Sequence, residues 1–290
     1  MNHLQILDCT LRDGAQVNKA KFGEKAIKEI VENLTHAGLD IIECGFLKNC
    51  EYECGRTYYP QPSFARPYIP EKTGNIIYAA LMDYGRYDVE HLEPYSGESF
   101  DLIRISFFEK DLGGLKPFIQ KVIDKGYKVS IQPMDTFSYS EQNIKKVIEI
   151  ANSLQAEALS MVDTYSLATI DDIDRVYNFY ENYLNKNTKI GFHSHNNQLN
   201  SFALAQHFLD ISKPDRNLII DASLYGMGRG GGNLNTELFA EYLNRTNIKH
   251  YKIKYILDMI DTYLVDFKNK FEWGYSLPMM YAGIYGVHVF

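Results

Sequence analysis

The chain has 290 residues, of which 45% are hydrophobic and 23% are charged, and its formal net charge is −7. This length fits one large α/β barrel or two ordinary domains, and the composition is that of a folded globular protein. The negative charge argues against a nucleic-acid partner, and no apolar run approaches the roughly 20 residues of a transmembrane helix, so we expect no membrane partner either.

Eight short β-type runs alternate with longer amphipathic stretches. The β-type runs cover residues 5–10, 40–46, 75–82, 101–108, 128–134, 158–164, 189–195 and 218–224. The stretches with helical periodicity cover residues 24–38, 114–126, 140–154, 169–184, 197–211 and 236–244. About eight strands separated by helices are typical of a (β/α)8 TIM barrel. A doubly wound open sheet is the alternative, but the turn after the first run has one glycine where the dinucleotide-binding form expects several.

The pattern changes after Asn244. Residues 248–271 have the periodicity of one further helix, and an apolar, tyrosine-rich tail follows. We therefore predict a catalytic barrel domain over residues 1–245 and a short C-terminal helical extension over 246–290. Because the chain ends on apolar residues, we expect the extension to begin a further region or to meet a partner domain. A homodimer is also left open.

The four cysteines predict a reducing environment. They are too few for a disulfide framework at this length, and no signal peptide is visible, so we expect a cytoplasmic protein. Cys50 and Cys54 could ligate zinc, but no second Cys or His pair follows at the spacing of a zinc site.

A histidine pair, His193 and His195, ends the seventh β-type run. Side chains at positions i and i+2 of a strand point the same way, roughly 7 Å apart at Cα, so both rings can converge on one cation. Asp13, after the first run, is the best candidate for an oxygen ligand. Two histidines and one carboxylate leave coordination positions open, as a catalytic metal requires. Taken alone, the histidines also fit two polar side chains at a solvated strand end.

Other polar residues lie near the ends of the runs, where barrels build their active sites. Arg12 either faces charge that develops on a bound oxygen or braces the strand end by pairing with its neighbour Asp13. For Arg104, Ser106 and Gln132 we favour a place in the interior of the barrel.

The segment GMGRGGGN, residues 226–233, follows the eighth run. It could approach a ligand closely, as a phosphate cradle does, and its glycines could make a tight turn with Asn233 as the N-cap of the next helix. Both interpretations are kept, because a cap residue can also face the site. It is not a P-loop, because no Gly-Lys-Ser/Thr follows.

Four segments resemble one family: LDCTLRDGAQ (7–16), IIECGF (41–46), FHSHNN (192–197) and IDASLYGMGRGGGN (220–233). They are similar to the metal-dependent lyase and aldolase TIM barrels that include 3-hydroxy-3-methylglutaryl-CoA lyase and the isopropylmalate and homocitrate synthases. The resemblance runs from about residue 4 to 245. The phrase YAGIYG (281–286) is most similar to the 4-hydroxy-2-oxovalerate aldolases.

The resemblance implies a divalent metal, Mn²⁺ or Mg²⁺, and names its ligands. By position these are Asp13, His193 and His195, with Asn233 as an additional ligand or close neighbour. The implied substrate is a small 2-oxo acid, cleaved by a retro-aldol reaction that leaves a pyruvate enolate.

The resemblance also assigns catalytic roles. Arg12 would stabilise the enolate oxygen, Glu43 would shape the metal site, and Tyr285 would match the acid/base tyrosine of the aldolases. Gln16 stands where those aldolases commonly have histidine and where the acyl-CoA condensing and cleaving branches have glutamine. The base is then Tyr285 or a water molecule at the metal.

Three alternatives to this mechanism stay open. A Schiff-base aldolase would use a lysine at the mouth, such as Lys48 or Lys110. Gln16 favours Claisen condensation of an acyl-CoA with a 2-oxo acid, or acyl-CoA cleavage, and release of free CoA would identify the condensation. A non-enzymatic barrel could bind metal or ligand for a partner domain.

Overall fold

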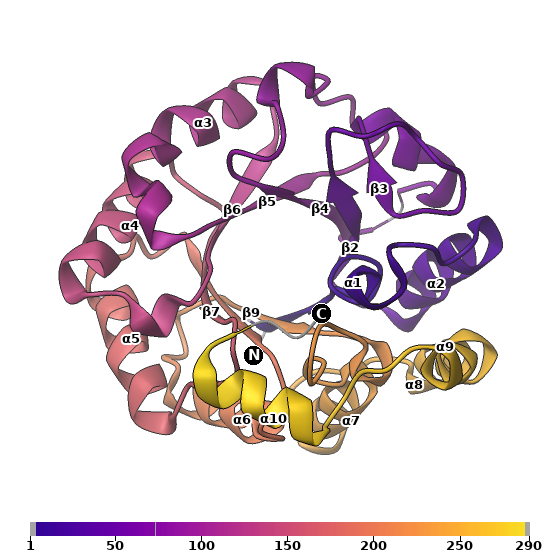
Figure 1. Ribbon diagram of the computed structural model, residues 1–290. Coiled ribbons are helices and arrows are strands. Elements are labelled where there is room, and N and C mark those ends of the chain that lie inside the picture. Colours follow the sequence, from indigo (N-terminus) through magenta and orange to yellow (C-terminus); the bar gives the residue numbers. More distant parts are fainter. Residues whose placement is uncertain (1–3, 73, 288–290) are drawn as a thin grey trace.

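A closed parallel barrel forms the body of the protein in the computed structural model, which describes residues 4–72 and 74–287 (Figure 1). Its strands are β1 (Leu4–Asp8), β2 (Ile41–Leu47), β4 (Ile77–Asp83), β5 (Leu102–Phe107), β6 (Lys128–Pro133), β7 (Ala158–Asp163), β8 (Lys189–Ser194) and β9 (Leu218–Ala222). The first strand, β1, pairs in parallel with both β2 and β9, which closes the ring of eight strands. The predicted TIM barrel is confirmed, and the open sheet is wrong.

Every helix predicted within the barrel is present on its outside. These helices are α2 (Glu24–Ala37), α3 (Leu112–Asp124), α4 (Glu141–Ser153), α5 (Ile170–Tyr183), α6 (Ser201–Ile211) and α7 (Thr236–Arg245). The sequence of α2 shows why these helices pack on the barrel. Its buried residues Ile27, Ile30 and Leu34 recur every three or four positions and face the sheet. Gly38 ends α2 in the left-handed region, at φ 83°, where glycine is favoured.

The regular alternation breaks at two connections. Between β2 and β4 the described residues form the short strand β3 (Tyr58–Tyr59) and a 3-10 segment, Pro62–Tyr68. Between β4 and β5 they form the 3-10 turn Val89–His91. The prolines at 60, 62, 67 and 70 explain the first break, because proline lacks the N–H that a helix interior needs.

The C-terminal extension is helical and packs on the barrel. It consists of α8 (Ile253–Met259), a π-helical turn (Ile260–Leu264), α9 (Val265–Lys270) and α10 (Leu277–Tyr285). Buried Trp273 donates its indole N–H to the carbonyl of Tyr225 in the loop after β9, at 3.1 Å. Asn197 donates to the carbonyl of Met279 at 2.9 Å, which ties α10 to the loop after β8.

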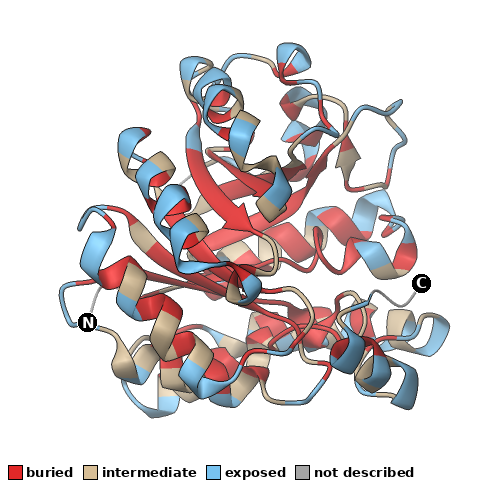
Figure 2. Ribbon diagram, turned by 60° about the vertical axis from the view of Figure 1, so that its left-hand side comes forward, coloured by how far each residue is buried: buried red, intermediate tan, exposed pale blue. Residues whose placement is uncertain are grey.

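The core lies on both sides of the strands. Figure 2 shows the strands mostly buried, whereas the helices are buried on their inner faces and exposed on their outer ones. A smaller apolar cluster, which includes Leu7, Ile41 and Leu102, is separate from the main core. Among the described helices, none combines the length and apolarity that a membrane crossing needs. The polar residues discussed next lie mostly at the carboxyl ends of the strands.

Candidate active site

The paired histidines at the end of β8 and the aspartate after β1 come together at the carboxyl end of the barrel. The backbone N–H groups of Arg12 and Asp13 both donate to the carbonyl of Cys9, at 3.0 and 2.7 Å, and this turn folds the chain back at the end of β1. One ligand atom each from Asp13, His193 and His195 lies within 4.8 Å of the other two, and all three residues are buried. We call these three residues the triad.

Each imidazole of the triad is held through its Nδ1 atom. The Nδ1 of His193 lies 3.0 Å from Oδ2 of Asp221, and that of His195 lies 3.2 Å from the carbonyl of Gly232. These contacts leave Nε2 of each ring available as a ligand atom. Burial, against the opposing charge of Asp13, lowers the pKa of His195 to about 4, so this ring is neutral at pH 7, as a metal ligand must be.

The third member, Asp13, is an ionised carboxylate. Burial disfavours its charge, but the charge of Arg12, together with the hydrogen bond from Asn233, holds the pKa of Asp13 well below its usual range. Its Oδ1 accepts from Nη1 of Arg12 at 2.8 Å, and its Oδ2 accepts from Nδ2 of Asn233 at 2.8 Å. The carboxylate is therefore oriented before any ligand arrives.

The donor set fits a divalent metal ion. Two imidazole nitrogens and a carboxylate converge, and the Oδ1 atom of Asn233 is buried without a hydrogen-bond partner. Such a mixture of nitrogen and oxygen donors is typical of divalent metal sites with open positions. Among the described residues, Cys50 and Cys54 belong to no comparable cluster.

Asn233 is not a helix cap, so that sequence prediction is wrong. The N-cap of α7 is Asn235, and Asn233 instead donates to Asp13. The glycine-rich loop before it passes very close to the triad. A Cβ atom on Gly228 would lie 2.3 Å from Nδ2 of Asn233 and 2.8 Å from Oδ2 of Asp13. The glycine is needed here because no side chain fits between the loop and the site.

We expect Gly228→Ala to weaken Mn²⁺ binding by about 10-fold while the protein stays folded. The added methyl group meets the movable ends of Asn233 and Asp13, so it displaces the site and not the backbone. Titration of Mn²⁺ by electron paramagnetic resonance, with thermal unfolding of the metal-free protein, measures both effects. Gly113→Ala is the matched control, because a Cβ there meets nothing within 4 Å. Equal Mn²⁺ affinity in the two variants would contradict the tight packing.

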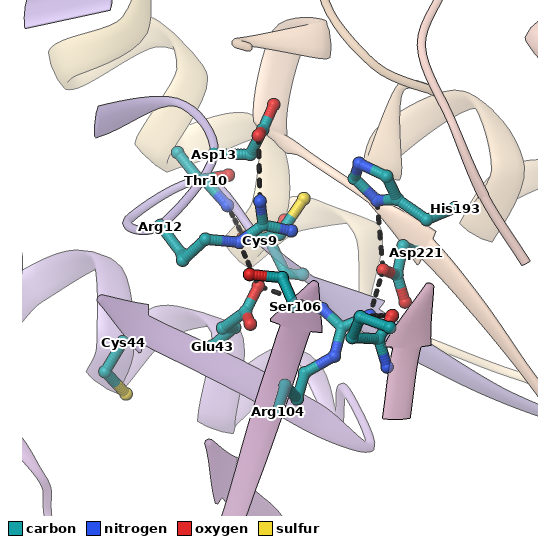
Figure 3. A network of polar contacts seen from close by, with 12 residues as sticks. Cys9, Thr10, Arg12, Asp13, Glu43, Cys44, Arg104, Ser106, His193 and Asp221 are labelled. Atoms are coloured by element: carbon teal, nitrogen blue, oxygen red, sulfur yellow. Dashed lines mark hydrogen bonds and ion pairs between the residues drawn. The ribbon is translucent and has the colours of Figure 1, made fainter. Parts of the chain in front are cut away.

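A buried ionic network lies beneath the triad (Figure 3). Glu43 accepts from Nε of Arg12 at 2.6 Å and from Nη1 of Arg104 at 3.0 Å. Arg104 also donates to Asp221, the residue that holds His193. Arg104 is only 1% exposed, so it lies in the barrel interior, as expected. The network links Arg12 on one side of the site to His193 on the other.

A cavity of about 530 Å³ opens beside the triad. This volume lies within the roughly 300–1,000 Å³ of small-molecule sites. The three triad residues line it together with Arg12 and Gln16. The structure thus brings Arg12, Gln16 and the triad into one site.

Two of the expected site residues have other surroundings. Glu43 is fully buried, does not line the cavity and contacts Arg12. Tyr285 is 70% exposed on α10, where its ring stacks on Tyr281, and it does not line the cavity.

Sequence reasoning missed Asp221. This residue is fully buried, binds His193 and Arg104, and fixes the histidine tautomer. One signal was available: it is a carboxylate inside the apolar run of β9 (Leu218–Ala222), where an unpaired charge would be costly.

This chain matches the model of a known protein family, and its curated relatives include the two proteins described here. The HMGL-like family model matches residues 3–57 and 110–262. A 4-hydroxy-2-oxovalerate aldolase from Bacillus thuringiensis (strain Al Hakam) is 25% identical over 290 residues, which cover 97% of this chain and 82% of the relative. An oxaloacetate decarboxylase from Mycobacterium tuberculosis (strain ATCC 25618 / H37Rv) is 24% identical over 246 residues, covering 83% and 70%.

Solved structures share the fold. The N-terminal domain of a candidate aldolase from Bacteroides vulgatus superposes with a TM-score of 0.82 at 22% identity. The match covers 98% of this chain and 93% of that domain. At this identity the likeness supports the barrel and the placing of its extension, not the chemistry.

Proposed function

Since this chain belongs to the HMGL-like family, which is of the lyase type, we propose that it is a divalent-metal-dependent aldolase that cleaves a 4-hydroxy-2-oxo acid. One observation carries the proposal: the triad of Asp13, His193 and His195 lines a cavity, and Arg12 lines the same cavity beside the triad. A Mn²⁺ or Mg²⁺ ion held by the triad supplies positive charge that polarises the 2-oxo group and favours the enolate.

Arg12 is the second source of positive charge. Its Nε and Nη1 atoms are fixed by Glu43 and Asp13, at 2.6 and 2.8 Å, so the guanidinium is positioned before the substrate binds. We assign it to the oxygen that becomes negative as the bond between C3 and C4 breaks. Glu43 then acts as a positioning residue, because it contacts the guanidinium and not the cavity.

The reaction also moves one proton. The 4-hydroxyl group loses its proton as the aldehyde leaves, and C3 of the enolate gains one to give pyruvate. Tyr285 or a water molecule is expected to take the hydroxyl proton, and of these the exposed ring of Tyr285 lies outside the lining of the cavity. In this conformation the proton cannot pass to it directly.

This placement favours a second candidate, decarboxylation of a 2-oxo acid such as oxaloacetate. Loss of CO₂ leaves the same enolate and needs no base to remove a hydroxyl proton, and one relative is named an oxaloacetate decarboxylase. The two candidates separate in one assay. Faster release of CO₂ from oxaloacetate than of acetaldehyde from 4-hydroxy-2-oxovalerate would favour the decarboxylase.

Metal removal tests what both candidates share. The protein is expected to exchange the methyl protons of pyruvate for deuterium in D₂O, because exchange requires the enolate and no aldehyde. EDTA should abolish the exchange, and Mn²⁺ or Mg²⁺ should restore it. NMR of the methyl signal measures the rate. Borohydride trapping of pyruvate on Lys48 or Lys110, with exchange unaffected by EDTA, would instead establish a Schiff-base aldolase.

A further inference from the structure

The cavity has a second charged side, away from the triad. Lys48, Arg86 and Lys110 line it and follow β2, β4 and β5, which are neighbours in the sheet. The triad comes from β8 and from the loop after β1, the strands that flank β9. In the closed ring of eight strands, β5 stands opposite β9. The β4 strand stands opposite β8, whereas β2 neighbours β1. A ligand that extends from the triad toward the side of the mouth formed by β2, β4 and β5 therefore meets these three cations, which we call the distal cations.

The distal cations make no ion pair with the described part of the chain. Instead, the ammonium of Lys48 lies over two rings, 4.8 Å from the centroid of Phe46 and 4.2 Å from that of Tyr58. Lys48 is half-buried, and this burial lowers its pKa. A partly desolvated cation without a carboxylate partner gains more from binding an anion than a solvated one does.

The two carboxylates of the lining outside the triad accept hydrogen bonds from other groups. Asp83 accepts from the hydroxyl of Ser106 at 2.5 Å, and Asp111 accepts from the backbone N–H of Phe108 at 3.0 Å. Counted together, five basic side chains (lysine and arginine) and three acidic ones line the cavity, an excess of two positive charges when the histidines are left out of the count. The whole chain carries −7, so positive charge is concentrated in the cavity against the overall balance.

We propose that the substrate carries a second anionic group, a carboxylate or a phosphate, and that Lys48, Arg86 and Lys110 bind it on the β2, β4 and β5 side of the cavity. The inference rests on the proposed aldolase function and names its substrate class: a 2-oxo acid whose leaving aldehyde is itself anionic. A 2-oxo acid with a neutral tail would leave the distal cations without a partner.

The aldol direction provides the test. In it, C3 of pyruvate loses a proton and bonds to the aldehyde carbon, whose oxygen gains a proton. Two matched aldehyde pairs are offered to the metal-loaded enzyme with pyruvate: butanal against succinic semialdehyde, and glyceraldehyde against glyceraldehyde 3-phosphate. We expect kcat/KM to be about 10- to 100-fold higher for the anionic member of one pair, the factor that hydrogen bonds to charged groups contribute. The pair that shows it identifies carboxylate or phosphate.

Two variants test whether the preference for an anionic aldehyde comes from the distal cations. Lys48→Met keeps the stem over the rings but removes the charge. Arg86→Met removes the charge at an exposed position that tolerates change. Each should reduce the ratio of anionic to neutral kcat/KM by about 10-fold. Lys145→Met is the matched control, because Lys145 also lies over two rings, 5.5 Å from Phe179 and 5.6 Å from Tyr183, but does not line the cavity. It should keep the wild-type ratio.

Failure of this inference is distinguishable from failure of the aldolase proposal. If pyruvate exchanges deuterium in a metal-dependent way but neither anionic aldehyde is preferred over its neutral partner, the distal cations do not select the substrate. A preference that both variants retain also overturns the assignment. If pyruvate does not exchange deuterium at all, the aldolase proposal is wrong, and the inference that rests on it is wrong as well.

Discussion

Asp13→Asn is expected to weaken Mn²⁺ binding by more than about 100-fold and to lower kcat for retro-aldol cleavage by about 1,000-fold. The substitution keeps the size of the side chain but removes the only anionic member of the triad. It also removes the negative charge that Nη1 of Arg12 contacts at 2.8 Å. Both sources of positive charge for the enolate are therefore disturbed by one change of charge.

Calorimetric titration of the metal-free protein with Mn²⁺ measures the loss independently of turnover. Asp8→Asn is the matched control, because Asp8 is equally buried at the end of β1 but accepts from Thr236 and does not line the cavity. Burial raises the pKa of Asp8 to about 6, so its neutral form is already accessible and the amide should be tolerated. If Asp13→Asn bound Mn²⁺ with wild-type affinity, the metal would not be bound by the triad.

The convergence of Asp13 with His193 and His195 could be predicted because it follows from simple geometry. Residues two apart at a strand end share a face, and the carboxyl ends of all strands of a parallel barrel meet at one mouth. Residues 180 positions apart in the chain are then neighbours by topology alone. The same rule predicts that Arg12 lies at the site, but it does not predict the direction of the Arg12 side chain.

The network beneath the site could not be predicted in the same way. Asp221 and Arg104 lie inside their strands, and which partner each finds across the barrel depends on strand register and rotamers that no local pattern contains. The N-cap interpretation of Asn233 was wrong for a similar reason, whereas the resemblance places this residue beside the metal ligands. The sequence offers two asparagines before α7, and only the course of the glycine-rich loop decides that Asn235 caps the helix while Asn233 reaches Asp13.

The tail shows the limit of reasoning from resemblance. Tyr285 sits in a phrase that matches the aldolases, but a phrase does not fix where a terminal helix packs. In the structure the backbone of Met279 ties α10 to Asn197, and the Tyr285 side chain on the same helix is exposed. Strand pairing fixes the position of residues at the strand ends, but it does not fix residues of a terminal helix. Roles assigned by resemblance are therefore weaker in the tail than at the strand ends.

Arg104→Met is expected to destabilise the metal-free protein by about 3–5 kcal/mol, the effect of removing one partner from a buried ion pair. Arg104 donates to Glu43 at 3.0 Å, to Gln132 at 2.9 Å and to Asp221. Without it, two buried carboxylates lose a compensating charge. Urea unfolding measures the change, and Arg175→Met, a half-exposed arginine that donates to the Phe137 carbonyl at 2.7 Å, should cost less than about 1 kcal/mol.

The cause can be separated from simple loss of packing. If the cost arises from the unpaired carboxylates, adding Asp221→Asn to Arg104→Met should recover part of the lost stability, because it neutralises one of them. The double variant should still bind Mn²⁺ more weakly than wild type, since an amide holds Nδ1 of His193 less firmly than the carboxylate does at 3.0 Å. A second substitution that only destabilises further would mean that Arg104 acts by filling space. The barrel interior would then support the metal site through shape and not through charge.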